Sequence, residues 1–271
     1  MEAPVHGHDC TLESFVRTRY FHGQLLEVLH FEGEQHYLNE KRWLINRLVL
    51  GYGVICGMNV IRDGQSVRVT AGVALDQAGR EIIVPCTSRP IAIPPREEDE
   101  DEDDEGTGHG ADGHHHDDDD GDEDDEYDRK EDKWMHLVIC YHECHSDPAP
   151  VEAGECDADP DCEFGAVRER YRLELRPGRL RPPYRECRLQ DLVRGGRIDY
   201  RGLVEAVSQP CPEIPEERCL PLANIRRPRG DYELGDRDVQ IGVRYIVFTN
   251  DLLYELILGV VWEPPKHGFK R

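Results

Sequence analysis

Hydrophobic runs long enough to cross a membrane are missing from this chain of 271 residues. The longest apolar stretch near its end, Leu252–Trp262, contains Glu255 and falls short of the roughly 20 residues that a membrane-spanning helix needs. The first residues, through Phe15, are polar and acidic, without the basic start and apolar centre of a secretory signal. We therefore expect no membrane insertion and synthesis in the cytoplasm, where cysteines stay reduced.

Sequence signatures of the common catalytic sites are also absent. The chain contains no GxSxG nucleophile elbow, no P-loop, no GxGxxG dinucleotide fingerprint and no HExxH helix. Gly51 and Gly53 are too few for a nucleotide loop, and they follow a helix-like segment, which is the wrong order for a Rossmann turn. The chain is accordingly predicted not to be an enzyme. An unrecognised reaction would need a cleft that gathers His142, Glu143 and Asp147.

Charge is abundant but unevenly distributed. The formal net charge is −23, and residues 97–132 alone hold 22 acidic side chains against Arg129 and Lys130. The rest of the chain, with 34 acidic and 31 basic residues, is nearly neutral. A block of like charge repels itself and has almost nothing apolar to bury, so residues 97–132 are predicted to form a disordered, His-rich acidic loop that acts mainly as a solubilising spacer. We call this segment the acidic insert.

Hydrophobic periodicity predicts an α+β, β-rich fold with a long N-terminal helix packed with small antiparallel β modules. The helix is expected from about Leu25 to Leu50, because four apolar positions fall on one stripe and Gly51 ends the pattern. The stripe residues are Phe31, Leu38, Ile45 and Leu48 or Val49.

After Gly53 the apolar period changes to two, which is typical of strands. Strands are predicted over residues 54–61, 66–76, 81–86, 89–94, 133–143, 168–175, 219–225 and 239–247, with an irregular stretch over 144–163. The acidic insert is interpreted as an enlarged hairpin connection, since long loops cost only logarithmically more to close. Short helices are expected over 197–209 and over 250–261, the second capped by Asn250. The chain thus divides into a flexible arm (1–16), a helix with a β module (17–96), the insert (97–132) and a β-rich continuation with a C-terminal helix (133–271).

The segment Cys140–His145 is the strongest candidate for a metal site. On a strand Cys140, His142 and Cys144 share one face, and Cys156 follows in a loop, which together supplies the soft ligands of a structural zinc. The spacing is not that of a CxxC knuckle. Alternatively Cys140 is a core residue, and the other cysteines are free or form a Cys144–Cys156 or Cys156–Cys162 disulfide. No other cofactor is predicted.

Basic residues cluster over Arg168–Arg188, with Tyr171 and Tyr184 between them. Such a cluster can face nucleic acid or the acidic insert of the same chain. The covalent tether favours the insert, so a nucleic-acid partner is not expected.

Residues Arg19–Val60 resemble the opening of bacterial proteins associated with phage-tail-like contractile injection systems, of the baseplate, fibre or cap-attachment type. Those proteins carry R-Y-F-x-G-x-L-L, then a charged helix that ends N-R-L-x-x-G-x-G-V-x-C-G-L-x-V, and His30 and Met58 are departures from their pattern. The segments TAGVALDQAGREIIVP (70–85), VICYHECHSDPAPV (138–151) and CLPLANI (219–225) are similar to further parts of the same proteins. The resemblance covers most of the chain outside the acidic insert.

This resemblance implies a non-enzymatic structural or attachment component of a contractile particle that can be released from the cell. Its partners would be other subunits of the particle, with a homo-oligomer as an open possibility. Apolar stripe residues and arginine anchors are what such contacts need. The docking residues expected on this basis are Tyr20, Phe21, Phe31, Trp43 and Arg47, although Phe31 and Trp43 fit an intramolecular core equally well. The alternative function is zinc binding through the Cys/His segment 140–162.

Overall fold

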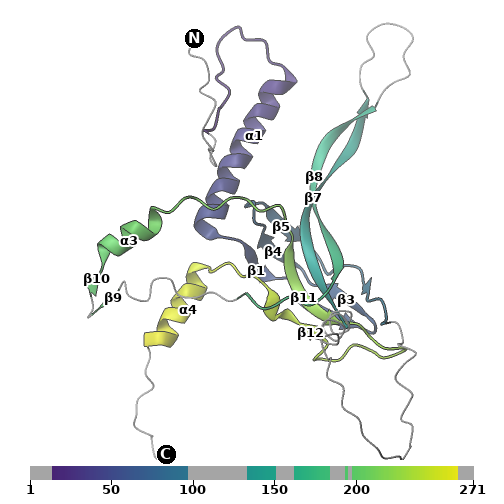
Figure 1. The fold of residues 1–271 in the computed structure, drawn as a ribbon. Helices are drawn as coiled ribbons and strands as arrows, with labels where there is room; N and C mark the ends of the chain where they lie inside the picture. Colours follow the sequence, from purple (N-terminus) through teal and green to yellow (C-terminus); the bar gives the residue numbers. More distant parts are fainter. Residues whose placement is uncertain (1–13, 97–132, 151–161, 184–192, 195–196, 262–271) are drawn as a thin grey trace, which may run out of the picture.

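The computed structural model describes residues 14–96, 133–150, 162–183, 193–194 and 197–261 (Figure 1). The predictions for the acidic insert, for Cys156 and for most of the N-terminal arm fall outside the described residues. Within them the fold is α+β, as predicted, with a long N-terminal helix, small antiparallel sheets and a short C-terminal helix.

Four antiparallel sheets are present in the described residues. Three have the orders β1-β4-β5, β2-β3-β6 and β12-β11-β7-β8, and the fourth pairs β9 with β10. The strands are β1 (Gly53–Gly57), β2 (Val60–Asp63), β3 (Ser66–Val69), β4 (Gly72–Leu75), β5 (Glu81–Val84), β6 (Ile91–Ala92), β7 (Trp134–Pro150), β8 (Cys162–Pro177), β9 (Val193–Arg194), β10 (Arg197–Ile198), β11 (Leu220–Arg226) and β12 (Val239–Gln240).

One hydrophobic core joins the three larger sheets. Strand β11 lies at its centre, since all of its residues except Arg226 are buried. The polar member of that strand, Asn224, is satisfied because its side-chain amide donates to the Leu180 carbonyl (2.8 Å) and accepts from the Leu180 N–H (2.9 Å). The principal apolar contributors are Val54, Met58, Val67, Val69, Ile82, Val84, Leu137, Ile139, Leu220, Leu222 and Ile225.

The helices are α1 (Val28–Ile45), which continues into a π-helical turn over Asn46–Leu50, α3 (Tyr200–Val207) and α4 (Asn250–Val261). The first begins three residues after the predicted start, and the other two lie where they were expected. Helix α4 is capped by Thr249 rather than Asn250, because the Leu252 N–H donates to Thr249 Oγ1 (3.3 Å). No described helix is both long enough and apolar enough to cross a bilayer.

Three predictions about the course of the chain were wrong. The insert does not connect a hairpin, because β6 pairs with β3 whereas β7 pairs with β11 and β8. Residues 239–247 form only the two-residue β12, a 3-10 turn over Ile241–Val243 and a single bridge between Val54 and Ile246. Finally, the irregular stretch begins later than predicted, since β7 and β8 stay paired as far as Pro150 and Cys162.

Candidate functional site

No residue of helix α1 is fully buried against the rest of the described chain. The predicted stripe is exposed: Phe31 retains 51%, Leu38 59% and Ile45 56% of its accessible surface. Figure 1 shows α1 rising away from the sheets. The residues of the predicted stripe therefore do not pack on the β modules of their own chain.

The last turn of α1 provides its attachment to the body. The Asn46 side chain donates to the Gly79 carbonyl and to Glu81 Oε1, both at 2.9 Å, and Arg42 Nε lies 3.1 Å from the same carboxylate. Gly79 (φ +89°) comes so close that a Cβ there would lie 2.1 Å from the Trp43 carbonyl oxygen. The turn between β4 and β5 thus holds one end of α1, and glycine is required for that approach.

The predicted docking residues fall into two groups. Tyr20, Phe21 and Phe31 are exposed at the free end of α1, where the Tyr20 hydroxyl donates to Glu34 Oε2 (2.7 Å). Trp43 and Arg47 instead lie half-buried at the attached end. The Arg47 guanidinium donates to the Pro212 carbonyl (2.6 Å), and the buried Trp43 indole N–H has no acceptor among the described residues.

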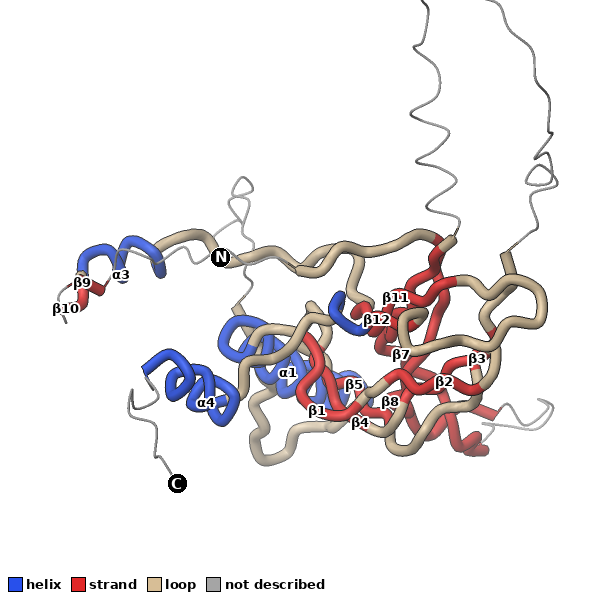
Figure 2. Tube along the Cα trace, turned by 90° about the horizontal axis from the view of Figure 1, so that it is seen from below, coloured by secondary structure: helices blue, strands red, loops and turns tan. Residues whose placement is uncertain are grey.

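Helices α3 and α4 present further apolar side chains to solvent. Both lie away from the three larger sheets in Figure 2 as well as in Figure 1. Helix α3 has no buried residue. The exposed apolar residues are Tyr200, Val204 and Val207 on α3, and Leu253, Tyr254, Leu256, Ile257 and Leu258 on α4.

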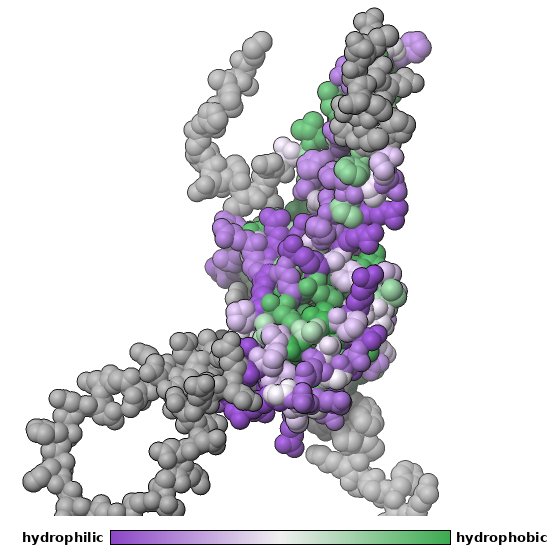
Figure 3. Space-filling view, turned by 90° about the vertical axis from the view of Figure 1, so that its right-hand side faces the viewer, coloured by the Kyte–Doolittle hydropathy of each residue, from purple (hydrophilic) through white to green (hydrophobic). Residues whose placement is uncertain are grey.

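Beyond Cys140, strands β7 and β8 leave the core as a two-stranded ribbon (Figure 1), which we define as residues 141–150 and 162–171. Figure 3, which views this side of the molecule, shows hydrophilic and hydrophobic side chains mixed over the projecting part. Directly opposite residues share a face, so His142 lies with Arg170 and Glu143 with Glu169. Glu143 accepts from the Tyr141 hydroxyl (2.7 Å); burial and this hydrogen bond raise the pKa of Tyr141.

The residues that an unrecognised reaction would need are not gathered in a cleft. His142 and Glu143 are neighbours on a strand and point to opposite faces of the ribbon. Asp147 lies further along and pairs with Arg168 (3.1 Å).

The predicted zinc ligands share one face of β7 but lie apart along it. Alternate residues of a strand are about 6.8 Å apart, which separates Cys140, His142 and Cys144 from one another. Cys140 instead forms a disulfide with Cys219, and Cys144 is a free cysteine. The predicted disulfides of Cys156 lie outside the described residues. Among the described residues, three potential metal-ligand atoms lie within 4.8 Å of one another. They belong to Cys140, Cys219 and Glu174.

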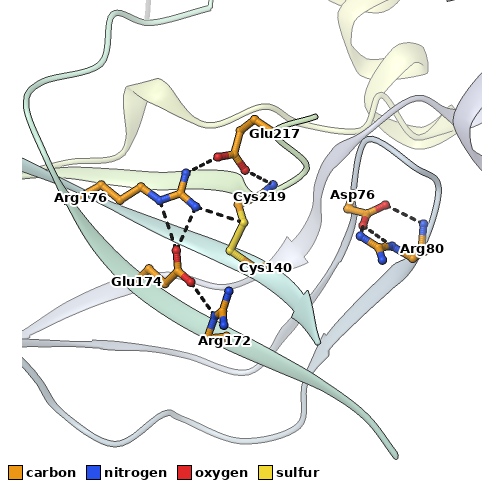
Figure 4. Close-up of a disulfide and its surroundings, with 8 residues drawn as sticks. All are labelled: Asp76, Arg80, Cys140, Arg172, Glu174, Arg176, Glu217 and Cys219. Carbon is orange, nitrogen blue, oxygen red and sulfur yellow. Dashed lines mark hydrogen bonds and ion pairs between the residues drawn. A yellow bond between two sulfur atoms is a disulfide. The ribbon is translucent and has the colours of Figure 1, made fainter. Parts of the chain in front are cut away.

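Charged side chains surround this disulfide (Figure 4). Arg176 donates to Glu174 Oε2 (2.9 Å), to Glu217 and to Cys219 Sγ (3.5 Å). Burial acts to raise the pKa of Glu217, but the Cys219 N–H and the Arg176 guanidinium outweigh it and lower that pKa below its usual value. Cys219 was not singled out in the sequence, since it lies 79 residues from Cys140 and belongs to no spaced motif.

A second buried polar cluster holds the turn between β4 and β5 (Figure 4). Asp76 is fully buried and accepts from the N–H groups of Ala78 (2.8 Å) and Arg80 (2.9 Å). It also pairs with the Arg80 guanidinium (2.6 Å), which lies 4.5 Å from the centre of the Tyr141 ring. Asp76, Gly79 and Arg80, which lie in the segment 70–85 of the resemblance, therefore build a turn and join the first sheet to the base of the ribbon.

Comparisons with known proteins find little. No protein-family model matches the sequence, and no curated protein is similar to it. Among solved structures, the chain is similar to one described as the crystal structure of TssK, with a TM-score of 0.36 and 12% sequence identity. The match covers 82% of this chain and 40% of TssK, so the chain spans well under two thirds of that protein. A similarity this low carries no argument about what this chain does.

Proposed function

We propose that this chain is a non-enzymatic structural subunit that attaches to other subunits of a contractile, phage-tail-like particle through the free end of α1. The observation that carries the proposal is the exposed apolar stripe of a helix that is held at its last turn. The resemblance of residues 19–60 to proteins of contractile injection systems supports the assignment to such a particle. That segment contains α1 together with the residues that lead into the helix and follow it.

The energetics of α1 favour a partner. Most helical stability in proteins comes from packing an apolar face, and no residue of α1 is fully buried. Full burial of a Phe or Leu side chain contributes roughly 1.5–3 kcal/mol. Covering Phe21, Phe31 and Leu38 would therefore supply several kcal/mol, which is the scale of a protein–protein contact with a few dominant residues.

The double substitution Phe21→Ser with Phe31→Ser tests the docking role. Both side chains are more than half exposed, so the free energy of unfolding of the isolated chain should change by less than about 0.5 kcal/mol. Co-purification of the full chain with its particle subunits from the native cell should fall by roughly 30-fold or more, the factor for the loss of a dominant contact. Quantitative mass spectrometry of the purified particle measures this loss.

Val167→Ser is the matched control, because Val167 is similarly exposed (56%) but lies on the ribbon. This variant should co-purify with the particle subunits as well as the wild type does. A chain that purifies without any particle subunit, or a double variant that is retained as well as the wild type, would count against the proposal.

A second candidate function is zinc binding, which the convergence of Cys140, Cys219 and Glu174 favours. Reduction of the disulfide would free two thiolates beside a carboxylate, a donor set that suits zinc. Full-length chain without an affinity tag, reduced and dialysed against zinc with mild chelation, should then retain one zinc per chain by elemental analysis. Glu174→Gln should lower that stoichiometry, and a metal-free wild type would exclude the zinc site.

A further inference from the structure

A basic cavity of about 390 Å³ lies where the acidic insert joins the described chain. Among the described residues that line it, Asp238 is the one with an acidic side chain. That carboxylate is already engaged, because it accepts from the Gly235 N–H (2.7 Å). Five basic residues line the cavity, and we call them the cradle: Arg96, Lys133, Arg226, Arg227 and Arg229.

The two residues that flank the insert are hydrogen-bonded to the loop over residues 227–229. Arg96 directly precedes the insert, and its N–H donates to the Pro228 carbonyl (2.9 Å). Lys133 directly follows the insert, and its carbonyl accepts from the Arg227 N–H (3.0 Å). The Arg227 side chain also donates to the Pro95 carbonyl (2.7 Å). The chain therefore enters and leaves its most acidic segment at the rim of one basic cavity.

We propose that the cradle is an anion-binding site whose ligand is a run of carboxylates, supplied by the acidic insert of the same chain. Carboxylates form charge-assisted, often bidentate hydrogen bonds with guanidinium groups, and four of the five cradle residues are arginines. Glu97 and Asp132 adjoin Arg96 and Lys133 in sequence, well inside a Debye length of about 10 Å. The tether also sets an effective carboxylate concentration on the order of millimolar, which an untethered anion has to exceed.

This assignment differs from the basic cluster predicted over Arg168–Arg188. The described part of that cluster runs along β8, where Arg168 and Arg172 already pair with Asp147 and Glu174. The cradle, in contrast, lies at the insert's own attachment points. It also gives the insert a binding role beyond that of a spacer.

Tryptic cleavage of the full chain at Arg129 and Lys130 tests the proposal. These are the basic residues inside the insert, and they lie next to its second attachment point. Cleavage there is measured by mass spectrometry relative to cleavage at Arg201, an exposed residue of α3 (89% exposed side chain) that serves as an internal reference. In wild type at low salt the relative cleavage should be slow, and about 0.5 M NaCl should raise it by roughly tenfold, because cleavage follows the population of undocked insert.

The variant Arg226→Gln with Arg229→Gln should show the fast rate already at low salt. Both side chains are exposed, so circular dichroism should show an unchanged fold. Arg170→Gln with Arg172→Gln removes the same number of positive charges from the ribbon and its base and should keep the slow rate. Equal rates in wild type and the cradle variant at low salt would overturn the proposal, as would a fast rate in the ribbon control.

Competing anions distinguish the source of the ligand. At constant ionic strength, a polyglutamate peptide added to wild type should raise the relative cleavage, because it displaces the insert from the cradle. Inorganic phosphate should raise the relative cleavage no more than chloride does at the same ionic strength. If phosphate releases the insert as well as polyglutamate does, the site takes any oxyanion and the assignment to carboxylates fails.

Discussion

Replacing Asp76 by alanine is expected to lower the free energy of unfolding by about 3–5 kcal/mol, the cost of removing one partner from a buried ion pair. Asp76 is fully buried and satisfies two backbone N–H groups in addition to the Arg80 guanidinium. Without it these donors lose their acceptor, and Arg80 remains a charge at the edge of the core. Urea denaturation followed by circular dichroism measures the change.

Asp63→Ala is the control for this substitution. Asp63 also pairs with an arginine, Arg68 (2.6 Å), but both side chains are 40–45% exposed. An exposed pair contributes about 0–1 kcal/mol, so this variant should unfold nearly as the wild type does. Equal stabilities of the two variants would show that the buried turn does not carry the energy assigned to it.

Removal of the Cys140–Cys219 disulfide, by substitution of both residues with alanine, is expected to destabilise the chain by about 4.5 kcal/mol. The figure follows from the loop entropy of a cross-link between residues 79 apart, and measured values commonly fall lower. The link joins β7 to Cys219, the residue directly before β11, so its loss loosens the two central strands of the largest sheet. Urea denaturation of oxidised wild type, reduced wild type and the double variant measures the effect.

Cys56→Ala and Cys86→Ala serve as controls, since both are exposed free cysteines. Each should change the free energy of unfolding by less than about 0.5 kcal/mol. The reduced wild type should resemble the double variant. If oxidation of the wild type adds no stability over the reduced chain, the disulfide does not stabilise this fold.

The elements were largely predictable from local pattern, whereas their partners were not. Period-two runs identify β3 and β5 most directly, because burial alternates along these two strands. Burial does not alternate along β1, β2 and β4, which were predicted from their β-branched residues and the turn residues between them. Pairing depends on contacts far apart in sequence, and for this reason the sequence failed to show that β6 joins β3 while β7 joins β11. Residues 239–247 resemble a strand in composition, yet tertiary contacts leave most of them outside the sheets.

The candidate site was predictable in part for the same reason. The apolar stripe of α1 is visible from its spacing, but spacing does not tell whether the stripe meets its own sheets or a partner. The exposure of Phe31 and Ile45 shows only that these two side chains do not pack on their own sheets. Pairing of Cys140 with Cys219, and convergence of Arg96 with Arg229, arise from chain folding and have no local signal.

Strand β7 also has a mechanical consequence. It is one continuous strand that begins beside β11 in the core and ends in the ribbon. Tension applied at the ribbon would run along the strand axis and load the β7–β11 hydrogen bonds together in shear. The Cys140–Cys219 disulfide would still hold the chain if those hydrogen bonds broke. We expect the ribbon to resist extraction under force, whereas α1, fastened at one end, would swing.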